Sequence, residues 1–197
     1  MFTGIVKGKF PVVMILDKEG LRSFIVVLSN ELVEGLVVGA SVAVDGVCFT
    51  VTGIDQNRVS FDAMEETLRK TTIGSLQERD FVNIERSARM GDEIGGHFVY
   101  GHVDGRARVM KVQKAPGALV MTISASRELL KYMIMKGTVA VDGVSLTIMR
   151  ISRGTFTVSL LKQTRDLTSL GIKHTGDDVN IEVDMINKFL VERCASK

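Results

Sequence analysis

The stretch VAVDGVCFTV at residues 42–51 returns, slightly altered, as VAVDGVSLTI at residues 139–148. The offset of 97 residues holds without a gap between 42–85 and 139–182, and 16 of these 44 positions are identical. A match of that length indicates two copies of one structural unit. Two copies in 197 residues indicate an internal duplication, because a solenoid usually needs three or more repeats.

Each copy has the pattern of short strands joined by turns rich in glycine. Asp45-Gly46 and Asp142-Gly143 each separate two alternating apolar runs, which is typical of a β-hairpin. About six such strands per half, with little helix, predict one small closed barrel per repeat. The sequence therefore predicts an all-β protein of two tandem six-stranded Greek-key β-barrels, related by internal duplication, with a C-terminal α-helix.

The domain boundaries are expected to follow the repeat. The first barrel is expected over residues 1–97, the second over 98–184, and the helix over 185–197. An isolated helix of that length is marginally stable, so it is expected to pack on the barrels or on other subunits. Its apolar residues share one helical face: Ile186, Phe189, Leu190 and Cys194.

Composition disfavours several classes of protein. A net charge of +2, no tryptophan and two tyrosines disfavour a nucleic-acid-binding barrel. The chain has no run of 18 apolar residues for a membrane helix, and MFTGIV does not resemble a signal peptide. Cys48 and Cys194 lie in unrelated contexts, which favours a reduced, cytoplasmic protein over a disulfide framework.

The residues just after each Asp-Gly turn are the first candidates for chemistry. Cys48 and its repeat partner Ser145 are small nucleophile-type residues, and a threonine follows two positions later, as Thr50 and Thr147. Residues i and i+2 of a strand point to the same face. The pattern fits two similar ligand sites, one per barrel. It also fits a cysteine that is simply a small buried hydrophobic residue, on a half-solvated face whose threonines favour strands.

The stretch GDEIGGHFVYGHVDG at residues 91–105 joins the repeats and contains His97 and His102. His97 fits a turn residue, and His102 fits a strand residue with a backbone partner. Five positions apart in a strand, the two rings would point to opposite faces, so no metal site is expected here or elsewhere.

Five motifs together resemble the riboflavin synthase family, whose chains carry lumazine-binding repeats. They are MFTGIV, GASVAVDGVCFTV, GDEIGGHFVYGHVDG, KGTVAVDGVSLTI and GDDVNIEVDMINKF, and they span residue 1 to about residue 189 at near-constant spacing. The resemblance implies conversion of two molecules of 6,7-dimethyl-8-ribityllumazine into riboflavin and 5-amino-6-ribitylaminouracil. One molecule gives a four-carbon unit to the other, with no cofactor. The alternative is a related antenna protein that binds lumazine or flavin without turnover.

The resemblance also implies partners. Family members are homotrimers assembled through the C-terminal helix, with each catalytic site between the first barrel of one subunit and the second barrel of its neighbour. Lys136 is then expected to reach the ligand of a neighbouring subunit. Lumazine synthase is a candidate partner, because some relatives dock onto its capsid.

The family's functional positions carry over as follows. Residues matching positions linked to catalysis are Phe2, Ser41, Cys48, His102, Ser145, Thr147 and Asp184. First-barrel ligand positions are expected at Gly4, Ile5, Val6, Cys48, Phe49, Thr50, Asp62, Ala63, Met64, Glu65, Glu66 and Thr67. Second-barrel ligand positions are expected at Gly101, His102, Val103, Ser145, Leu146, Thr147, Ser159, Leu160, Leu161, Lys162, Gln163 and Thr164.

The roles of these residues are hypotheses. His102, or a water held by a serine or threonine, would remove a proton from the C7 methyl group of the substrate. Cys48 or Ser145 would add to the electron-poor ring, or would hold the water that adds. Lys162-Gln163 stand where the family usually has proline followed by histidine or glutamate, a departure that frees the second loop and restores a backbone N–H group.

Overall fold

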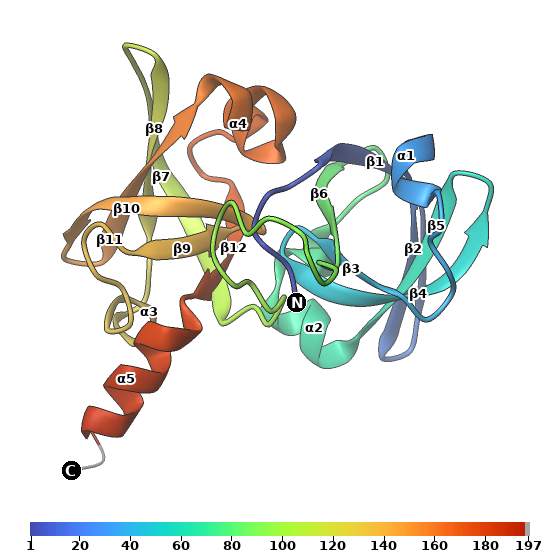
Figure 1. Ribbon diagram of the computed structural model, residues 1–197, viewed down its shortest axis with the longest axis horizontal. Helices are drawn as coiled ribbons and strands as arrows, with labels where there is room; N and C mark the ends of the chain where they lie inside the picture. The colour runs from blue at the N-terminus through green and yellow to red at the C-terminus, as the bar shows by residue number, and fades with distance from the viewer. Residues whose placement is uncertain (196–197) are drawn as a thin grey trace.

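The computed structural model describes residues 1–195 and shows two closed six-stranded barrels side by side (Figure 1). All neighbouring strands of the first barrel are antiparallel, in the order β1-β2-β5-β4-β3-β6, with β6 closing on β1. Its strands are β1 (Gly8–Lys18), β2 (Leu21–Val27), β3 (Ser41–Val44), β4 (Val47–Asp55), β5 (Arg58–Met64) and β6 (Phe81–Arg86).

The second barrel repeats this order as β7-β8-β11-β10-β9-β12, again closed and antiparallel. The predicted all-β fold with two similar barrels is confirmed. The strands are β7 (Gly105–Ala115), β8 (Ala118–Ser124), β9 (Thr138–Val141), β10 (Val144–Ser152), β11 (Thr155–Leu161) and β12 (Asp178–Val183).

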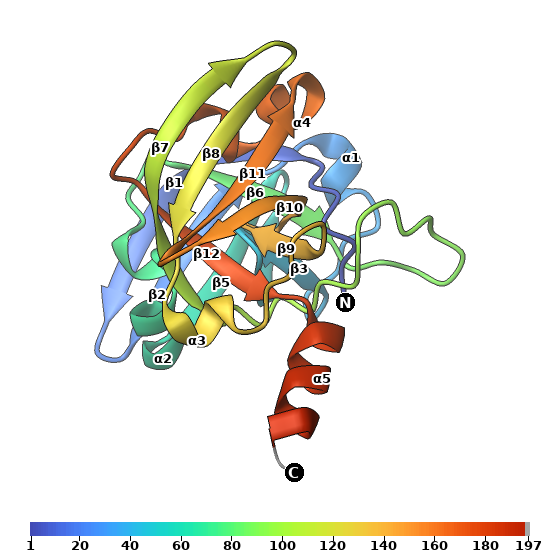
Figure 2. The same cartoon turned by 90° about the vertical axis from the view of Figure 1, so that its left-hand side faces the viewer.

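The helices all lie outside the barrels, and all but the last are short. The first barrel carries α1 (Asn30–Val33), α2 (Glu65–Lys70) and the 3-10 turn η1 (Thr72–Ser75). The second carries α3 (Arg127–Leu130), α4 (Lys162–Leu167) and η2 (Ser169–Ile172). The longest, α5 (Met185–Ala195), projects away from the second barrel (Figure 2). The helix expected over 185–197 is thus present, with residues 196–197 outside the described part of the chain. No helix within residues 1–195 is long and apolar enough to cross a membrane.

The two Asp-Gly turns meet where the barrels touch. Asp45 and Gly46 both have positive φ, at 44° and 76°, and Asp142 and Gly143 repeat this at 45° and 79°. A Cβ atom on Gly46 would stand 2.5 Å from the backbone nitrogen of Gly143. Gly46 and Gly143 are therefore required for two reasons: the turn needs a positive φ, and the two backbones approach too closely to admit a Cβ atom.

Buried polar side chains fasten this contact in a symmetric way. Asn83 Nδ2 donates to the carbonyl of Asp142 at 2.9 Å, and Asn180 Nδ2 donates to the carbonyl of Asp45 at 2.9 Å. The carboxylate of each aspartate accepts from the backbone N–H of the asparagine in its own barrel, at 2.7 Å. The repeated Asp-Gly turns and the repeated sequence VNIE, at residues 82–85 and 179–182, therefore join the barrels to each other as well as shaping each one.

Lys173 breaks the symmetry of this junction, because its repeat partner is Leu76. Its Nζ lies 3.6 Å from Oδ2 of Asp142, which is fully buried and has no hydrogen-bond donor. Burial raises the pKa of Asp45 well above its ordinary value, and nearby Asp142 adds to the shift. Burial also raises the pKa of Asp142, although Lys173 opposes the rise. One cation thus serves two buried acids.

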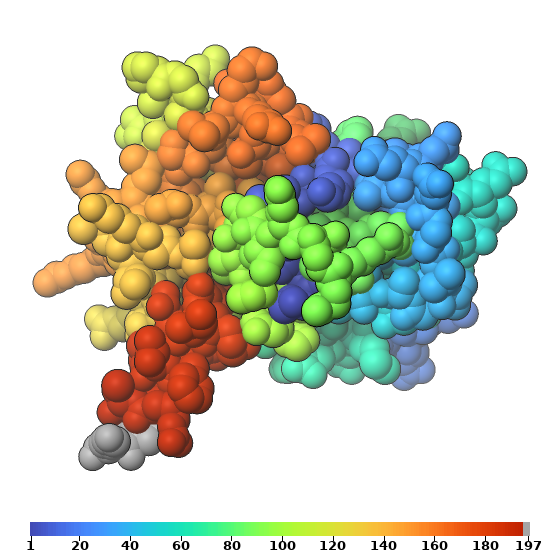
Figure 3. Space-filling view, viewed as in Figure 1, coloured from blue at the N-terminus to red at the C-terminus, as the bar shows by residue number. Residues whose placement is uncertain are grey.

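The two hydrophobic cores each take one residue from the opposite half of the chain. Val6 is buried in the core of the second barrel, with Leu146 and Ile181, whereas Val103 is buried in the core of the first barrel. The segments before β1 and β7, residues 1–7 and 98–104, are therefore crossing segments, since each packs against the barrel of the other half. They run side by side between the barrels, joined by hydrogen bonds between Phe2 and Val99, whose residues form an isolated β-bridge. The linker covers the N-terminus on one face of the molecule (Figure 3).

Candidate functional site

The first candidate face lies on β3 and β4. Cys48 is half-buried and Thr50 is exposed, whereas Phe49 between them is buried in the core against Phe24, with ring centroids 5.2 Å apart. The predicted alternation, with Cys48 and Thr50 on one face, is confirmed. Ser41 pairs with Thr50 across the two strands, so it lies beside the same face.

The second candidate face repeats this arrangement on β9 and β10. Ser145 is half-buried, Thr147 is exposed, and Leu146 points into the core. Thr138 takes the place of Ser41 opposite Thr147. The hydroxyl of Thr138 donates to Oδ2 of Asp184 at 2.7 Å.

Each crossing segment meets the face of the opposite barrel: the N-terminal segment meets the second face, and the segment before β7 meets the first. The backbone N–H of Ser145 donates to the carbonyl of Gly4, and that of Cys48 donates to the carbonyl of Gly101, both at 2.9 Å. The expectation that residues 4–6 serve the first barrel and 101–103 the second is therefore wrong. Identical backbone hydrogen bonds are available from either copy, so the repeat alone does not say which copy each segment contacts.

His97 was expected to be a plain turn residue, but its ring lies against the second face. Its Nδ1 is 2.7 Å from the hydroxyl oxygen of Ser145. Burial lowers the pKa of His97, and the carboxylate of Asp184 only partly offsets this. A neutral imidazole at that distance is able to accept the serine proton. The sequence signal for this contact was the glycine at position 96, next to His97. The structure explains that glycine, because a Cβ atom there would collide with the carbonyl oxygen of Thr3 and with Ser145.

His102 was expected in a strand, yet it lies in an irregular segment and is exposed. Its ring stacks on Tyr100, with centroids 6.4 Å apart. Because Gly101 is bonded to the backbone of Cys48, His102 starts from the edge of the first face, not the second. The linker thus brings His97 into contact with Ser145, while His102 directly follows Gly101, whose carbonyl is bonded to the backbone of Cys48.

Asp184 links the second face to the last helix. Its Oδ1 accepts from the backbone N–H groups of Ile186 at 2.9 Å and Asn187 at 3.2 Å, which is the geometry of a helix N-cap. Its Oδ2 is bonded to Thr138 beside Thr147. One carboxylate therefore orients both the first turn of α5 and the strand next to the candidate nucleophile. Phe2, another expected catalytic position, is fully buried between the barrels, in a cluster with Ala43, Val99 and Ala140.

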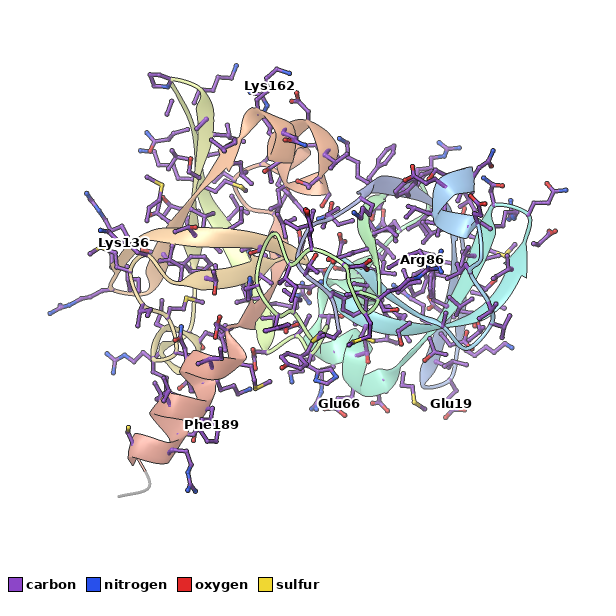
Figure 4. The ribbon with its side chains drawn as sticks, in the orientation of Figure 1. Glu19, Glu66, Arg86, Lys136, Lys162 and Phe189 are labelled. Atoms are coloured by element: carbon purple, nitrogen blue, oxygen red, sulfur yellow. The ribbon has the colours of Figure 1, made fainter. Side chains whose placement is uncertain are left out.

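The expected ligand loops continue these faces outwards. Residues 62–67 run from β5 into α2, and residues 159–164 run from β11 into α4. Their side chains alternate, with Ala63 and Leu160 fully buried and Met64 and Leu161 exposed. Glu66 and Lys162, which mark the two loops, lie on opposite sides of the molecule (Figure 4).

Lys136 lies at the far end of the second barrel (Figure 4), exposed and with a φ of 67°. It is not beside either crossing segment. Within residues 1–195, no group of three or more His, Cys, Asp or Glu side chains is arranged to hold a metal ion.

Comparison with known proteins identifies the repeat. The lumazine binding domain matches residues 3–87 and again residues 100–184. Riboflavin synthase of Escherichia coli (strain K12) is 42% identical over 193 residues, covering 98% of this chain and 91% of the relative. The chain belongs to the riboflavin synthase family. Other similar members are the riboflavin synthases of Chlamydia muridarum (42% over 192 residues, covering 98% and 94%) and Bacillus amyloliquefaciens (38% over 190 residues, covering 96% and 88%).

Solved structures of LumP share the fold of this riboflavin synthase family member. LumP complexed with riboflavin superposes with a TM-score of 0.88 at 26% identity, covering 93% of this chain and all of LumP. LumP complexed with 6,7-dimethyl-8-(1'-D-ribityl) lumazine gives a TM-score of 0.85 at 25% identity, covering 93% of this chain and 99% of LumP.

Proposed function

We propose that this chain is a riboflavin synthase that converts two molecules of 6,7-dimethyl-8-ribityllumazine into riboflavin and 5-amino-6-ribitylaminouracil. Two substrate molecules and two products contain the same atoms, so the exchange of a four-carbon unit balances without an added oxidant or reductant. The identity to curated riboflavin synthases along nearly the whole chain supports this activity.

The observation that carries the proposal is a pair of similar but unequal faces. Each offers a strand-borne nucleophile-type group, a threonine two residues on and one linker histidine. They differ in the sulfur of Cys48 and the hydroxyl of Ser145, and Ser145 is in contact with His97. A reaction between two copies of one molecule in different roles needs such a pair of sites.

The proposed roles follow from chemistry. The C7 methyl group of the substrate is acidic because its carbanion is delocalised into the ring, so a histidine is a sufficient base. His102 is proposed as that base at the first face. Ser145, with His97 to accept its proton, is proposed to add to the ring at the second face. Alignment of two bound lumazines would supply much of the acceleration, since orientation is worth about 7–11 kcal/mol in favourable cases.

A single chain does not bring the two ligand loops together, because α2 and α4 lie on opposite sides of it. We therefore propose that the reaction occurs between subunits of a homotrimer, with α5 as the assembly element. Ile186, Phe189 and Leu190 are 63, 62 and 54% exposed in the single chain, so this apolar face is available for contact.

The remaining proposals concern the cellular location, a partner protein and the domain boundary. A cytoplasmic location fits two cysteines that are both free, one half-buried and one exposed. Lumazine synthase remains a candidate partner on the ground of the family resemblance. The domain division at residue 97 also stays a proposal.

The test is to incubate the purified chain with 6,7-dimethyl-8-ribityllumazine alone. Two lumazines should disappear for each riboflavin formed, followed by absorbance and by chromatography of both products. Tight binding of lumazine without any riboflavin would contradict the enzyme and favour an antenna protein of the LumP kind. A requirement for an added redox cofactor would contradict the proposed reaction.

A further inference from the structure

Two buried glutamates hold the crossing segments in place. Glu85 lies on β6 of the first barrel and Glu182 at the same position of β12 in the second, and each is only 4% exposed. Ionised carboxylates are costly to bury unless hydrogen-bond donors surround them. The donors available to each glutamate come from the crossing segment that passes it.

Glu85 is fully satisfied. Its Oε1 accepts from the backbone N–H of Thr3 at 2.7 Å and from the Thr3 hydroxyl at 2.8 Å. Its Oε2 accepts from the backbone N–H of Gly4 at 3.1 Å. Three donors from two consecutive residues fix the path of the N-terminal segment.

Glu182 has a poorer set of donors. Its Oε1 accepts from the backbone N–H of Tyr100 at 2.6 Å, while Oε2 has no hydrogen-bond partner. Tyr100 is the repeat partner of Thr3, so the hydroxyl that reaches Glu85 has no counterpart here. Burial raises the pKa of Glu182, although the backbone N–H groups of Tyr100, Gly101 and His102 oppose the rise.

Each anchored segment leads directly to the ligand face of the other barrel. After Tyr100 comes Gly101, whose carbonyl is bonded to Cys48, and then His102. After Thr3 comes Gly4, whose carbonyl is bonded to Ser145, and the carbonyl of Thr3 accepts from the N–H of His97 at 3.1 Å. The residues anchored by the glutamate of one barrel are therefore followed, within one or two positions, by residues that contact or adjoin the face of the other barrel.

We propose that Glu182 is a positioning residue for the Cys48 and His102 face, and that Glu85 is the positioning residue for the Ser145 and His97 face. Each barrel thus controls the geometry of the site on its neighbour within the same chain. The link to turnover rests on the proposed function, but the positioning itself does not.

Replacement by glutamine tests the carboxylate with little change of shape. An amide has one acceptor oxygen and one NH2 group, so at Glu85 it loses an acceptor for one of three donors. At Glu182 the neutral amide removes the charge that the backbone N–H groups of Tyr100, Gly101 and His102 favour. Both changes should shift the anchored segment, and a shift of about 1 Å at a catalytic group costs up to a hundredfold in rate.

The chain offers a compact set of probes. It has three histidines, His97, His102 and His174, so each face has one reporter and the third serves as an internal control. In a Cys194→Ser background, Cys48 is the only thiol. Imidazole NMR resonances and the rate of Cys48 alkylation then report separately on the two faces, with or without turnover.

For Glu182→Gln we expect shifted His102 resonances, an alkylation rate of Cys48 changed by about threefold or more, and kcat lowered by about tenfold or more. His97 and His174 should be unmoved. For Glu85→Gln we expect the His97 resonances to move while Cys48 alkylation stays within about twofold. Effects on the same-barrel face, or equal effects on both faces, would overturn the assignment.

A second variant covers the case in which Glu182→Gln does not fold. Tyr100→Thr supplies the hydroxyl that Thr3 gives to Glu85. The readout for this variant is Cys48 alkylation, because loss of the Tyr100 ring from its stack on His102 moves the His102 resonances by itself. The Cys48 rate should change while the His97 resonances stay unmoved, and an unchanged Cys48 rate would refute the positioning role of Glu182. A wild-type chain that makes no riboflavin would defeat the proposed function only, since the resonance and alkylation measurements need no turnover.

Discussion

At the scale of single residues, Lys173 is the cation that lies beside the two buried aspartates of the barrel junction. Its ammonium pairs with the buried Asp142, and the same pair lies beside Asp45 at the barrel junction. Burial lowers the pKa of Lys173, but Asp142, Asp45 and Asp177 together raise it above its ordinary value. Lys173 therefore stays charged through the neutral range and offsets the charge of the aspartates.

We expect Lys173→Met to lower the free energy of unfolding by about 3 kcal/mol at pH 8, the lower end for losing one partner of a buried pair, since Lys173 is partly exposed. The loss should be smaller at pH 5. Both aspartates have raised pKa values, so the folded state binds their protons more tightly and gains stability as pH falls through those values. Urea unfolding at both pH values measures this, with exposed Lys111→Met as control. An equal loss at pH 5 and pH 8 would show that charge is not the cause.

Residue-scale inference from sequence succeeded where geometry is local. Strand alternation alone placed Cys48 and Thr50 on one face, because the period of two follows from the backbone. It failed for Gly4 and His97, because their neighbours are set by the crossing of two segments. The repeat makes both halves chemically equivalent partners, so no local pattern distinguishes a segment that stays from one that crosses.

At the scale of elements, the two hairpins act as the joint between barrels. Gly46 has a φ of 76°, and a Cβ atom there would meet the backbone of Gly143 at 2.5 Å. Gly117, in the β7–β8 turn, has a similar φ of 72° but no atom within 4 Å of the added Cβ. Comparing alanine substitutions at Gly46 and Gly117 therefore separates the free-energy cost of a positive φ from the cost of the clash with the neighbouring backbone.

We expect Gly117→Ala to cost about 1 kcal/mol, the conformational part alone, and Gly46→Ala to cost about 3 kcal/mol or more. The extra loss arises because the Asp142-Gly143 backbone must move away and weaken the asparagine hydrogen bonds. Denaturant unfolding of both variants gives the difference. Equal costs would mean that the two hairpins are free to separate.

The sequence predicted most elements, because Asp-Gly turns and alternating runs are local signals. The hairpins expected around Asp45-Gly46 and Asp142-Gly143 are present as β3–β4 and β9–β10. Among the helices, only the C-terminal one was predicted by its bounds, and α3 is a single turn that ends at Leu130. The 3-10 turns η1 and η2 had no predicted counterpart. Each begins with a backbone N–H bonded to the asparagine of the opposite barrel, a contact between residues 108 positions apart for η1 and 86 for η2.

At the scale of the whole molecule, the single chain has two ligand loops that do not face each other and a helix with an apolar side left open. Lys131, Tyr132 and Asp104 contact the opposite, polar side of α5 through Glu192 and Lys188. The helix is therefore fixed to its own barrel on one side, which leaves Phe189 and its neighbours directed outwards (Figure 4). That arrangement favours assembly through α5 over closure of the helix onto its own chain.

We expect Phe189→Asp to convert the proposed trimer into monomers, because each helix would place a charge in an apolar contact between subunits. Sedimentation measures the mass, and riboflavin formation should fall with the loss of trimer while each barrel still binds lumazine. Leu16→Asp is the matched control, since Leu16 is 51% exposed on β1 of the first barrel, away from α5. It should leave both mass and turnover unchanged. A monomeric Phe189→Asp chain with full activity would refute catalysis between subunits, and a variant that stays trimeric would refute α5 as the assembly element.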